Sequence, residues 1–143
     1  MQGQRPRLRA GHPREGSGLP RGGFTLECDA VARIAQARLW GFWDLEVAGR
    51  FRVELLALCA QFGAKKWSAL VDSRTFLPQT PEVTGHRRET MVMIMGHHCG
   101  RIAAIVAENG TYAMQFTRIA TEAGVVNAVF LDPVRALEWV RED

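Results

Sequence analysis

Two periodicities of hydrophobic and polar positions alternate along the chain, and together they predict a mixed α/β domain. Phe24, Leu26 and Cys28 alternate with polar residues, which is the period of two expected for a strand with one buried face. A second strand is expected over residues 32–40. Because only a few residues separate the two segments, we expect them to form a hairpin.

The next segment has the three- and four-residue spacing of an amphipathic helix. Apolar residues recur at these steps between Leu45 and Phe62, which gives one continuous apolar stripe. Asp44 is a suitable N-cap, and Glu46 places a negative charge in the first turn, where the helix dipole favours it. Gly63 is expected to end the helix because glycine readily adopts the left-handed conformation.

The rest of the chain repeats a strand followed by a helix. Short buried strands are expected over residues 67–72, 101–107 and 126–131. Helices are expected from Pro81, after Gly110 and from Pro133, because cap residues and helix-starting prolines stand there. The predicted order is ββαβαβαβα, an α/β fold in which helices pack against a mixed sheet.

The positive charge of the chain is concentrated at its N-terminus. The 143 residues include 18 Lys and Arg against 15 Asp and Glu, a formal net charge of +3. Residues 1–22 contain five arginines against Glu15, so the remainder is close to neutral. Gly, Pro and Arg dominate this segment, and it is expected to be a disordered basic extension before a single domain over residues 23–143. The folded part therefore gives no indication of nucleic-acid binding.

The apolar runs and the cysteines of the sequence indicate the cellular compartment of the protein. No apolar run approaches the roughly 20 residues that span a bilayer, and no apolar segment of signal-peptide type follows the first arginines. Cys28, Cys59 and Cys99 are an odd number at wide spacings, which is typical of reduced cysteines in a cytoplasmic protein. No cofactor-binding motif is present, and no cofactor is expected.

One group of residues could ligate a metal. His97, His98 and Cys99 are consecutive, and His86 lies eleven residues earlier. Zinc sites need three or four converging ligands, and adjacent histidines point apart in a helix or a strand. We interpret the group as loop histidines beside a buried cysteine and expect no metal site. A hydrolase or metal enzyme that uses these residues is the least favoured hypothesis.

A polar segment follows the predicted strand over residues 67–72. Asp72, Ser73, Arg74 and Thr75 would lie at the carboxyl end of that strand, where α/β sheets commonly bind ligands. Nucleophilic catalysis by Ser73 would require a histidine base and an oxyanion hole, and the chain has no GxSxG motif. Turn hydrogen bonds explain these residues, and a polar contact site is the alternative.

Three aromatic residues stand between the second strand and the first helix. Trp40, Phe42 and Trp43 cannot all point inward from so short a segment, and exposed aromatic clusters mark contact surfaces. Trp40 is expected in the core because it continues the strand. Trp43 is expected to face outward, and Trp40, Phe42 and Trp43 are together the candidate residues for contact with a partner or ligand. The alternative is that Trp40 ends a core strand and Phe42 packs against the following helix.

The second predicted helix is rich in methionine. Met91, Met93 and Met95 alternate with Val92 and Ile94, so this helix is apolar on most sides. Methionine adapts to loosely shaped apolar surfaces. The helix therefore packs in the core, walls an apolar cavity or covers part of a partner; Met91 and Met95 are the candidate contact residues.

The chain resembles the STAS domain, the fold of anti-sigma-factor antagonists. The resemblance covers about residues 24–143 and depends on the order of elements, with the segments WSALVD (67–72), RIAAIVA (101–107) and FLDPVRALEWV (130–140). It implies a mixed sheet with packed helices and a bacterial, cytoplasmic, non-enzymatic regulatory module. Such a module docks a protein partner under the control of phosphorylation.

The sequence departs from the regulatory members of that family at the phosphorylation site. Those members carry an Asp-Ser-Ser/Ala-Gly type motif with a serine at the start of the second helix, whereas residues 76–82 here contain no serine. Ser73 and Thr80 are the remaining candidate phosphoacceptors. The favoured function is docking of a protein partner or a second copy of the chain. The alternative is binding of a small apolar ligand or lipid in a cleft beside the strand C-termini.

Overall fold

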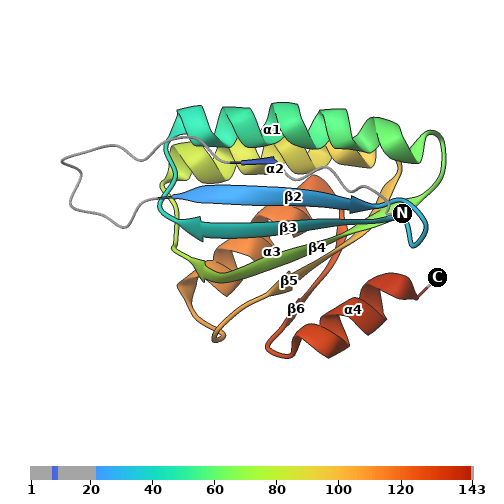
Figure 1. Ribbon diagram of the computed structural model, residues 1–143. Helices are drawn as coiled ribbons and strands as arrows, with labels where there is room; N and C mark the ends of the chain where they lie inside the picture. Colours follow the sequence, from blue (N-terminus) through green and yellow to red (C-terminus); the bar gives the residue numbers. More distant parts are fainter. Residues whose placement is uncertain (1–7, 10–21, 143) are drawn as a thin grey trace.

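The computed structural model describes residues 8–9 and 22–142 (Figure 1). Six strands form one sheet in the order β1-β2-β3-β4-β5-β6. Their bounds are β1 Leu8–Arg9, β2 Gly23–Asp29, β3 Ile34–Gly41, β4 Trp67–Phe76, β5 Cys99–Ile105 and β6 Val126–Phe130. The first three strands pair antiparallel and the pairs from β3 to β6 are parallel, so the predicted mixed sheet is confirmed.

Most of the expected N-terminal extension lies outside the described residues. Of residues 1–22, the structure describes Leu8, Arg9 and Gly22. Leu8 pairs with Leu26 and Arg9 with Thr25, so β1 adds a short outer strand to the hairpin of β2 and β3. These two residues of the basic segment therefore belong to the sheet.

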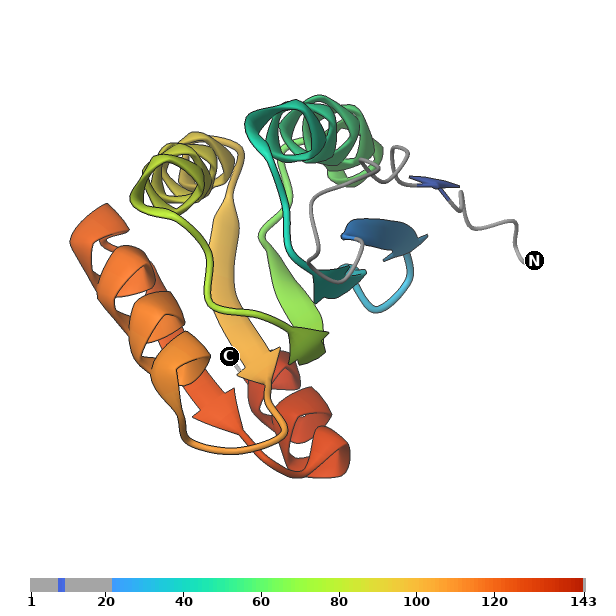
Figure 2. The ribbon, with the colours of Figure 1, turned by 90° about the vertical axis from the view of Figure 1, so that its left-hand side faces the viewer.

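Helices cover both faces of the sheet. Their bounds are α1 Leu45–Cys59, α2 Pro81–Met95, α3 Thr111–Ala123 and α4 Pro133–Arg141, and a 3-10 turn over Ala60–Phe62 extends α1. Figure 2 shows α1, α2 and α3 on one side of the strands and α4 on the other. No helix among the described residues has the length and apolar composition needed to cross a membrane.

The helices begin and end where the capping signals predict. The side chains of Asp44, Thr80 and Asp132 each accept a hydrogen bond from a backbone N–H two or three residues later, which satisfies a donor at the start of a helix. Gly124 ends α3 with a φ of 87°, a left-handed conformation that glycine adopts without a steric penalty. Local sequence thus sets these boundaries.

Strand β4 is longer than predicted. It was expected over residues 67–72, but it continues to Phe76 because β3 pairs with it as far as Gly41. Trp40 pairs with Thr75, after a register shift that follows Arg38. The polar residues 72–75 therefore lie within the strand rather than in the loop after it.

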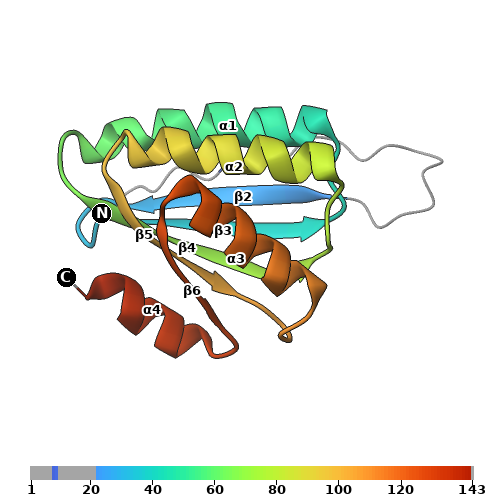
Figure 3. The ribbon, with the colours of Figure 1, turned by 180° about the vertical axis from the view of Figure 1, so that it is seen from behind.

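The main core fills the space between the sheet and the three helices α1, α2 and α3. It contains a cluster of aromatic rings at the end of the sheet where β2 begins, formed by Phe24, Trp43, Phe51 and Phe76. On the other face a smaller core lies under α4, which packs against β4, β5 and β6 (Figure 3). Helix α4 thus covers only part of its face of the sheet.

Candidate functional site

The surface is hollowed at the edge of the sheet where β3, β4 and β5 end. One part of this hollow has a volume of about 570 Å³ and is lined by Arg38, Trp40, Gly41, Arg74, Thr75, Phe76 and Leu77. The other part has about 270 Å³ and is lined by residues 73–74, 76–78, 106–108 and 110–112. Arg74, Phe76 and Leu77 belong to both parts, so we describe them together as the strand-end hollow. Carboxyl ends of parallel strands are a common position for binding sites.

Two arginines and one carboxylate define the charge of the wider part of the hollow, whereas Glu108 adds a second carboxylate to the other part. Arg74 makes a bidentate contact with Asp72, with Nε 3.0 Å from Oδ1 and Nη2 2.7 Å from Oδ2. Arg38 is the cross-strand partner of Asp72. The hydrogen bond from the Arg74 side chain, with a smaller contribution from the charge of Arg38, lowers the pKa of Asp72. Asp72 is therefore ionised at neutral pH, and these three side chains carry a net charge of +1.

Trp40 supplies the aromatic surface of the hollow. The guanidinium carbon of Arg38 lies 5.6 Å from the centroid of the Trp40 ring, within the range of a cation–π contact. Trp40 is half-buried and Arg38 is exposed, so both can contact another molecule. The two side chains share the sheet face that also carries α4.

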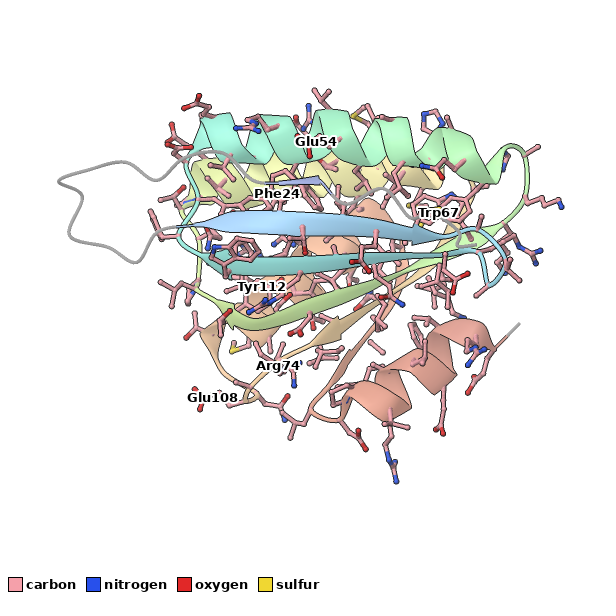
Figure 4. The ribbon with its side chains drawn as sticks, viewed as in Figure 1. Phe24, Glu54, Trp67, Arg74, Glu108 and Tyr112 are labelled. Atoms are coloured by element: carbon pink, nitrogen blue, oxygen red, sulfur yellow. The ribbon has the colours of Figure 1, made fainter. Side chains whose placement is uncertain are left out.

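A buried hydroxyl pair forms the floor of the second part of the hollow. The hydroxyl oxygens of Ser73 and Tyr112 are 3.2 Å apart, and the Tyr112 ring packs edge-on against Phe76. Figure 4 shows Arg74, Glu108 and Tyr112 at this end of the molecule. Only 2% of Ser73 is exposed, so its hydroxyl is inaccessible to a kinase in the folded state.

Thr80 is the more accessible of the two candidate phosphoacceptors. It is partly exposed at the start of α2, and its Oγ1 accepts a hydrogen bond from the N–H of Val83. A phosphate here would lie at a helix N-terminus, where negative charge is stabilising. Phosphorylation of either residue stays a prediction.

Sequence reasoning missed Gln79, which fixes the loop below the hollow. Its Oε1 accepts a hydrogen bond from the Trp43 backbone N–H at 2.8 Å, and its Nε2 donates to the Gly41 carbonyl oxygen at 3.1 Å. Its own backbone N–H and carbonyl oxygen pair with the side-chain amide of Gln115. Gln79 thereby ties the end of β3, the loop after β4 and α3 together. No local pattern distinguishes this glutamine from an exposed one.

The expected orientations of the two tryptophans are wrong. Trp43 is only 1% exposed, and its ring packs against Phe24, Phe51 and Phe76. β3 ends at Gly41, whose φ of 71° turns the chain, and the Trp43 ring after this turn enters the core. Trp40 follows the core-facing Leu39 on β3, so it points to the opposite face of the sheet and lines the hollow. Trp43 is therefore not a contact residue in the folded state, whereas contact by Trp40 and by the half-buried Phe42 stays a prediction.

The methionine-rich helix does not contribute to the hollow. Met91 is buried between α2 and the sheet, where it lines an interior cavity. Met95 is 37% exposed at the other end of α2, beside Gly124. The structure therefore brings Trp40, Asp72, Ser73, Arg74 and Thr75 together and separates Met91 and Met95 from them.

The metal-capable residues lie on different surfaces. His97 and His98 are exposed in the turn after α2, whereas Cys99 is buried at the start of β5 and His86 lies on α2. Within residues 8–9 and 22–142, no three His, Cys, Asp or Glu side chains converge in an arrangement that could hold a metal ion.

Comparison with solved structures identifies the fold. A protein from Shewanella loihica PV-4, described as an uncharacterised member of the DUF3478 family with a SpoIIAA-like fold, matches with a TM-score of 0.64 and 18% identity over 89% of this chain and 99% of that chain. An anti-sigma factor antagonist from Mycobacterium paratuberculosis matches with a TM-score of 0.54 and 12% identity over 97% of this chain and 96% of that chain. The chain thus has a STAS-like fold, as the resemblance predicted. No protein-family model and no curated protein matches the sequence.

Proposed function

We propose that the chain is a non-enzymatic regulatory module that docks a protein partner through the strand-end hollow. The observation that carries the proposal is the grouping of Trp40, Arg38 and Arg74 on one concave surface. Tryptophan and arginine are the residues most enriched among those that dominate binding energy at protein interfaces. The similar fold of an anti-sigma factor antagonist, a protein whose name describes action on another protein, supports the same class of function.

The charge of the wider part of the hollow, away from Glu108, favours a partner with an acidic segment. Arg38 is exposed and makes no ion pair with a described residue, so its guanidinium remains available to a carboxylate. Asp72 neutralises only one of the two arginines. A carboxylate that reaches Arg38 would form a charge-assisted hydrogen bond with it. The partner would also cover the apolar surface of Trp40 that is exposed in the free chain, and this burial favours binding. A second copy of the chain would have to present such a segment itself.

A small apolar ligand is the second candidate occupant. The apolar side chains Phe76, Leu77, Pro78 and Val106 line the second part of the hollow and favour it. The volume of this part, about 270 Å³, is below the range of roughly 300–1,000 Å³ that is typical of ligand pockets. The wider part is bordered by the two arginines. Size and charge therefore favour a protein partner over a lipid.

Localisation follows from the same proposal. The three cysteines are free and buried, which suits a reducing compartment such as the bacterial cytoplasm. The two solved structures described above come from bacteria. We therefore place the module in the bacterial cytoplasm, where its partner would also be found.

Affinity capture with matched variants tests the docking surface. The full chain, Arg38→Glu and Arg118→Glu are immobilised in parallel and exposed to lysate of the source organism. Arg118→Glu is the control, because Arg118 is exposed on α3 on the opposite side of the sheet. We expect one protein to be retained by the unaltered chain and by Arg118→Glu and to be lost with Arg38→Glu.

Titration of the captured protein completes the test. Its affinity for the unaltered chain should fall as salt is raised, because ions screen exposed charge pairs. Retention by all three baits, or an affinity that is independent of salt, would contradict docking of an acidic segment at the hollow. Analytical ultracentrifugation of the unaltered chain and of Arg38→Glu shows whether a second copy takes that place. A dimer that is lost in Arg38→Glu would overturn the proposal of a separate partner.

A further inference from the structure

The loop between β5 and α3 contains an exposed Asn-Gly pair beside the strand-end hollow. Asn109 is exposed, and Gly110 is the N-cap residue of α3. Within residues 22–142, no hydrogen bond holds the Asn109 side chain or the Gly110 backbone N–H. Figure 4 shows the preceding residue, Glu108, at the end of the molecule where the hollow lies. The asparagine amide is therefore free to turn toward the backbone that follows it.

The second asparagine of the chain lies in a contrasting environment. Asn127 is half-buried on β6, and its Nδ2 donates hydrogen bonds to the carbonyl oxygen of Val125 at 2.9 Å and to the hydroxyl of Thr121 at 3.3 Å. Its backbone is part of the sheet, and Ala128 follows it. Of the two asparagines, only Asn109 combines an unrestrained side chain with a following glycine.

This setting permits an intramolecular reaction between the side chain and the backbone. Because glycine has no Cβ, the Gly110 nitrogen can approach Cγ of Asn109 without hindrance. A bond forms between these two atoms, the Cγ–Nδ2 bond breaks, and ammonia leaves with the proton that the Gly110 nitrogen gives up. Water then opens the resulting cyclic imide at either carbonyl carbon, which leaves aspartate or isoaspartate at position 109. The net reaction consumes one water molecule and needs no oxidant, reductant or other reactant.

We propose that Asn109 is a site of spontaneous deamidation that adds a negative charge to the rim of the strand-end hollow. Glu108 and Gly110, on either side of it, both line the second part of the hollow. Helix α3 begins at this point without a side-chain cap, and the helix dipole stabilises a negative charge near a helix N-terminus. The modified rim would carry two neighbouring carboxylates instead of one.

Peptide mapping by mass spectrometry of the full chain tests the proposal. The folded protein is incubated at mildly alkaline pH and sampled over time, and a sample without incubation corrects for deamidation during digestion. We expect the peptide with Asn109 to gain the mass difference between an amide and a carboxylic acid, and the peptide with Asn127 to remain unchanged. No change at Asn109, or equal rates at both positions, would overturn the proposal.

A substitution at Gly110 tests which atom attacks. Gly110→Ser adds a Cβ, which would lie 3.3 Å from Oε2 of the flexible Glu108 side chain. The φ of −113° at this position suits a serine, and serine is a favoured N-cap residue, so the start of α3 should be kept. We expect deamidation of Asn109 to become about tenfold slower, because the Cβ hinders the approach to the nitrogen. An unchanged rate would contradict attack by the Gly110 nitrogen.

A matched variant separates the effect of the structure from that of the dipeptide. Ala128→Gly gives Asn127 the same following residue as Asn109 but leaves its side-chain hydrogen bonds and its place in β6. We expect Asn127 of this variant to stay unmodified in the folded protein and to deamidate in concentrated urea. Deamidation of folded Ala128→Gly at the rate of Asn109 would show that the structure does not select the site.

The consequence for docking rests on the proposed function and is measured separately. Asn109→Asp carries the charge of the product, and Asn109→Gln is its neutral control. We expect Asn109→Asp to bind the captured partner more weakly than Asn109→Gln, with a difference that shrinks as salt is raised. Equal affinities, with binding still lost in Arg38→Glu, would overturn this consequence and leave the docking surface intact. Binding that also survives Arg38→Glu would instead refute the docking surface, whereas peptide mapping decides the modification in either case.

Discussion

The indole N–H of Trp43 donates a hydrogen bond to the carbonyl oxygen of Gly23 at 3.0 Å. This bond fastens the corner between β3 and α1 to the first residue of β2. The Trp43 ring lies among three aromatic rings whose centroids are 5.0 to 5.8 Å away. Residues 40–43 therefore contain one tryptophan that stabilises the core, Trp43, and one that is accessible to a partner, Trp40.

Truncation of the two tryptophans should have opposite consequences. Trp43→Ala removes a fully buried side chain and should lower the free energy of unfolding by about 3–5 kcal/mol. Trp40→Ala removes a half-buried side chain and should cost about 1 kcal/mol, while weakening partner binding. Urea unfolding of both variants measures the difference. Similar losses of stability would contradict the assigned orientations.

Gln79 should contribute more to stability than its polar character suggests. Gln79→Ala would leave the Trp43 backbone N–H without its partner in a buried environment, while the Gly41 carbonyl oxygen would keep its bond from the Leu77 N–H. We expect a loss of about 1–3 kcal/mol in the free energy of unfolding, which is the cost of one unsatisfied buried group. Gln61→Ala, at an exposed position, is the control in the same thermal melts. A loss no larger than that of the control would show that water replaces these bonds.

Negative charge at Thr80 should weaken docking without destabilising the fold. Asp and Asn are equally good N-cap residues, so Thr80→Asp and Thr80→Asn should both keep α2 and its stability. Only Thr80→Asp adds a charge beside the loop that borders the hollow. We expect it to bind the captured partner more weakly than Thr80→Asn, with a difference that shrinks as salt is raised. Equal affinities at low salt would contradict electrostatic control at this position.

The buried thiols should make the fold sensitive to alkaline pH. Desolvation raises the pKa of Cys59 to about 11 and that of Cys99 to about 12, from an ordinary value of 9.0. At pH values between 9.0 and the raised pKa of each thiol, the unfolded chain releases thiol protons that the folded chain retains. The stability contribution is therefore complete below about pH 9 and is lost as the pH rises toward 12.

Substitution of both Cys59 and Cys99 measures how much the buried thiols contribute to the loss of stability at alkaline pH. The free energy of unfolding should fall less steeply between pH 9 and pH 11 for Cys59→Ala/Cys99→Ala than for the unaltered chain. Urea titrations at several pH values provide the comparison, with each protein normalised to its own stability at pH 8. Parallel pH profiles would show that other groups control the alkaline transition.

The sequence predicts the fold well because local signals determine its elements. Asp44 and Thr80 are caps in the structure as predicted, and the two-residue period of β2 places Phe24 and Leu26 in the core. The end of β4 could not be predicted in the same way. Its last residues are strand only because β3 pairs with them, and such pairing has no local signature.

The candidate site was predicted only in part. Trp40 and Arg74 belong to the hollow, but the assignment of Trp43 failed because the chain turns at Gly41, with a φ of 71°, and directs the Trp43 ring into the core. The burial of Gln79 and of Arg87, a residue of α2, was missed because burial of a polar side chain depends on tertiary packing.

Amide NMR of the complex shows directly whether the partner docks at the strand-end hollow. The labelled chain is titrated with the captured partner, and shifted signals are mapped on the fold. If the hollow is the docking surface, the largest changes fall on residues 38–41 and 74–77, whereas α4 and the part of α3 after Tyr112 change little. Changes concentrated on the exposed faces of α1 and α2, with the hollow unaffected, would show that the partner docks elsewhere.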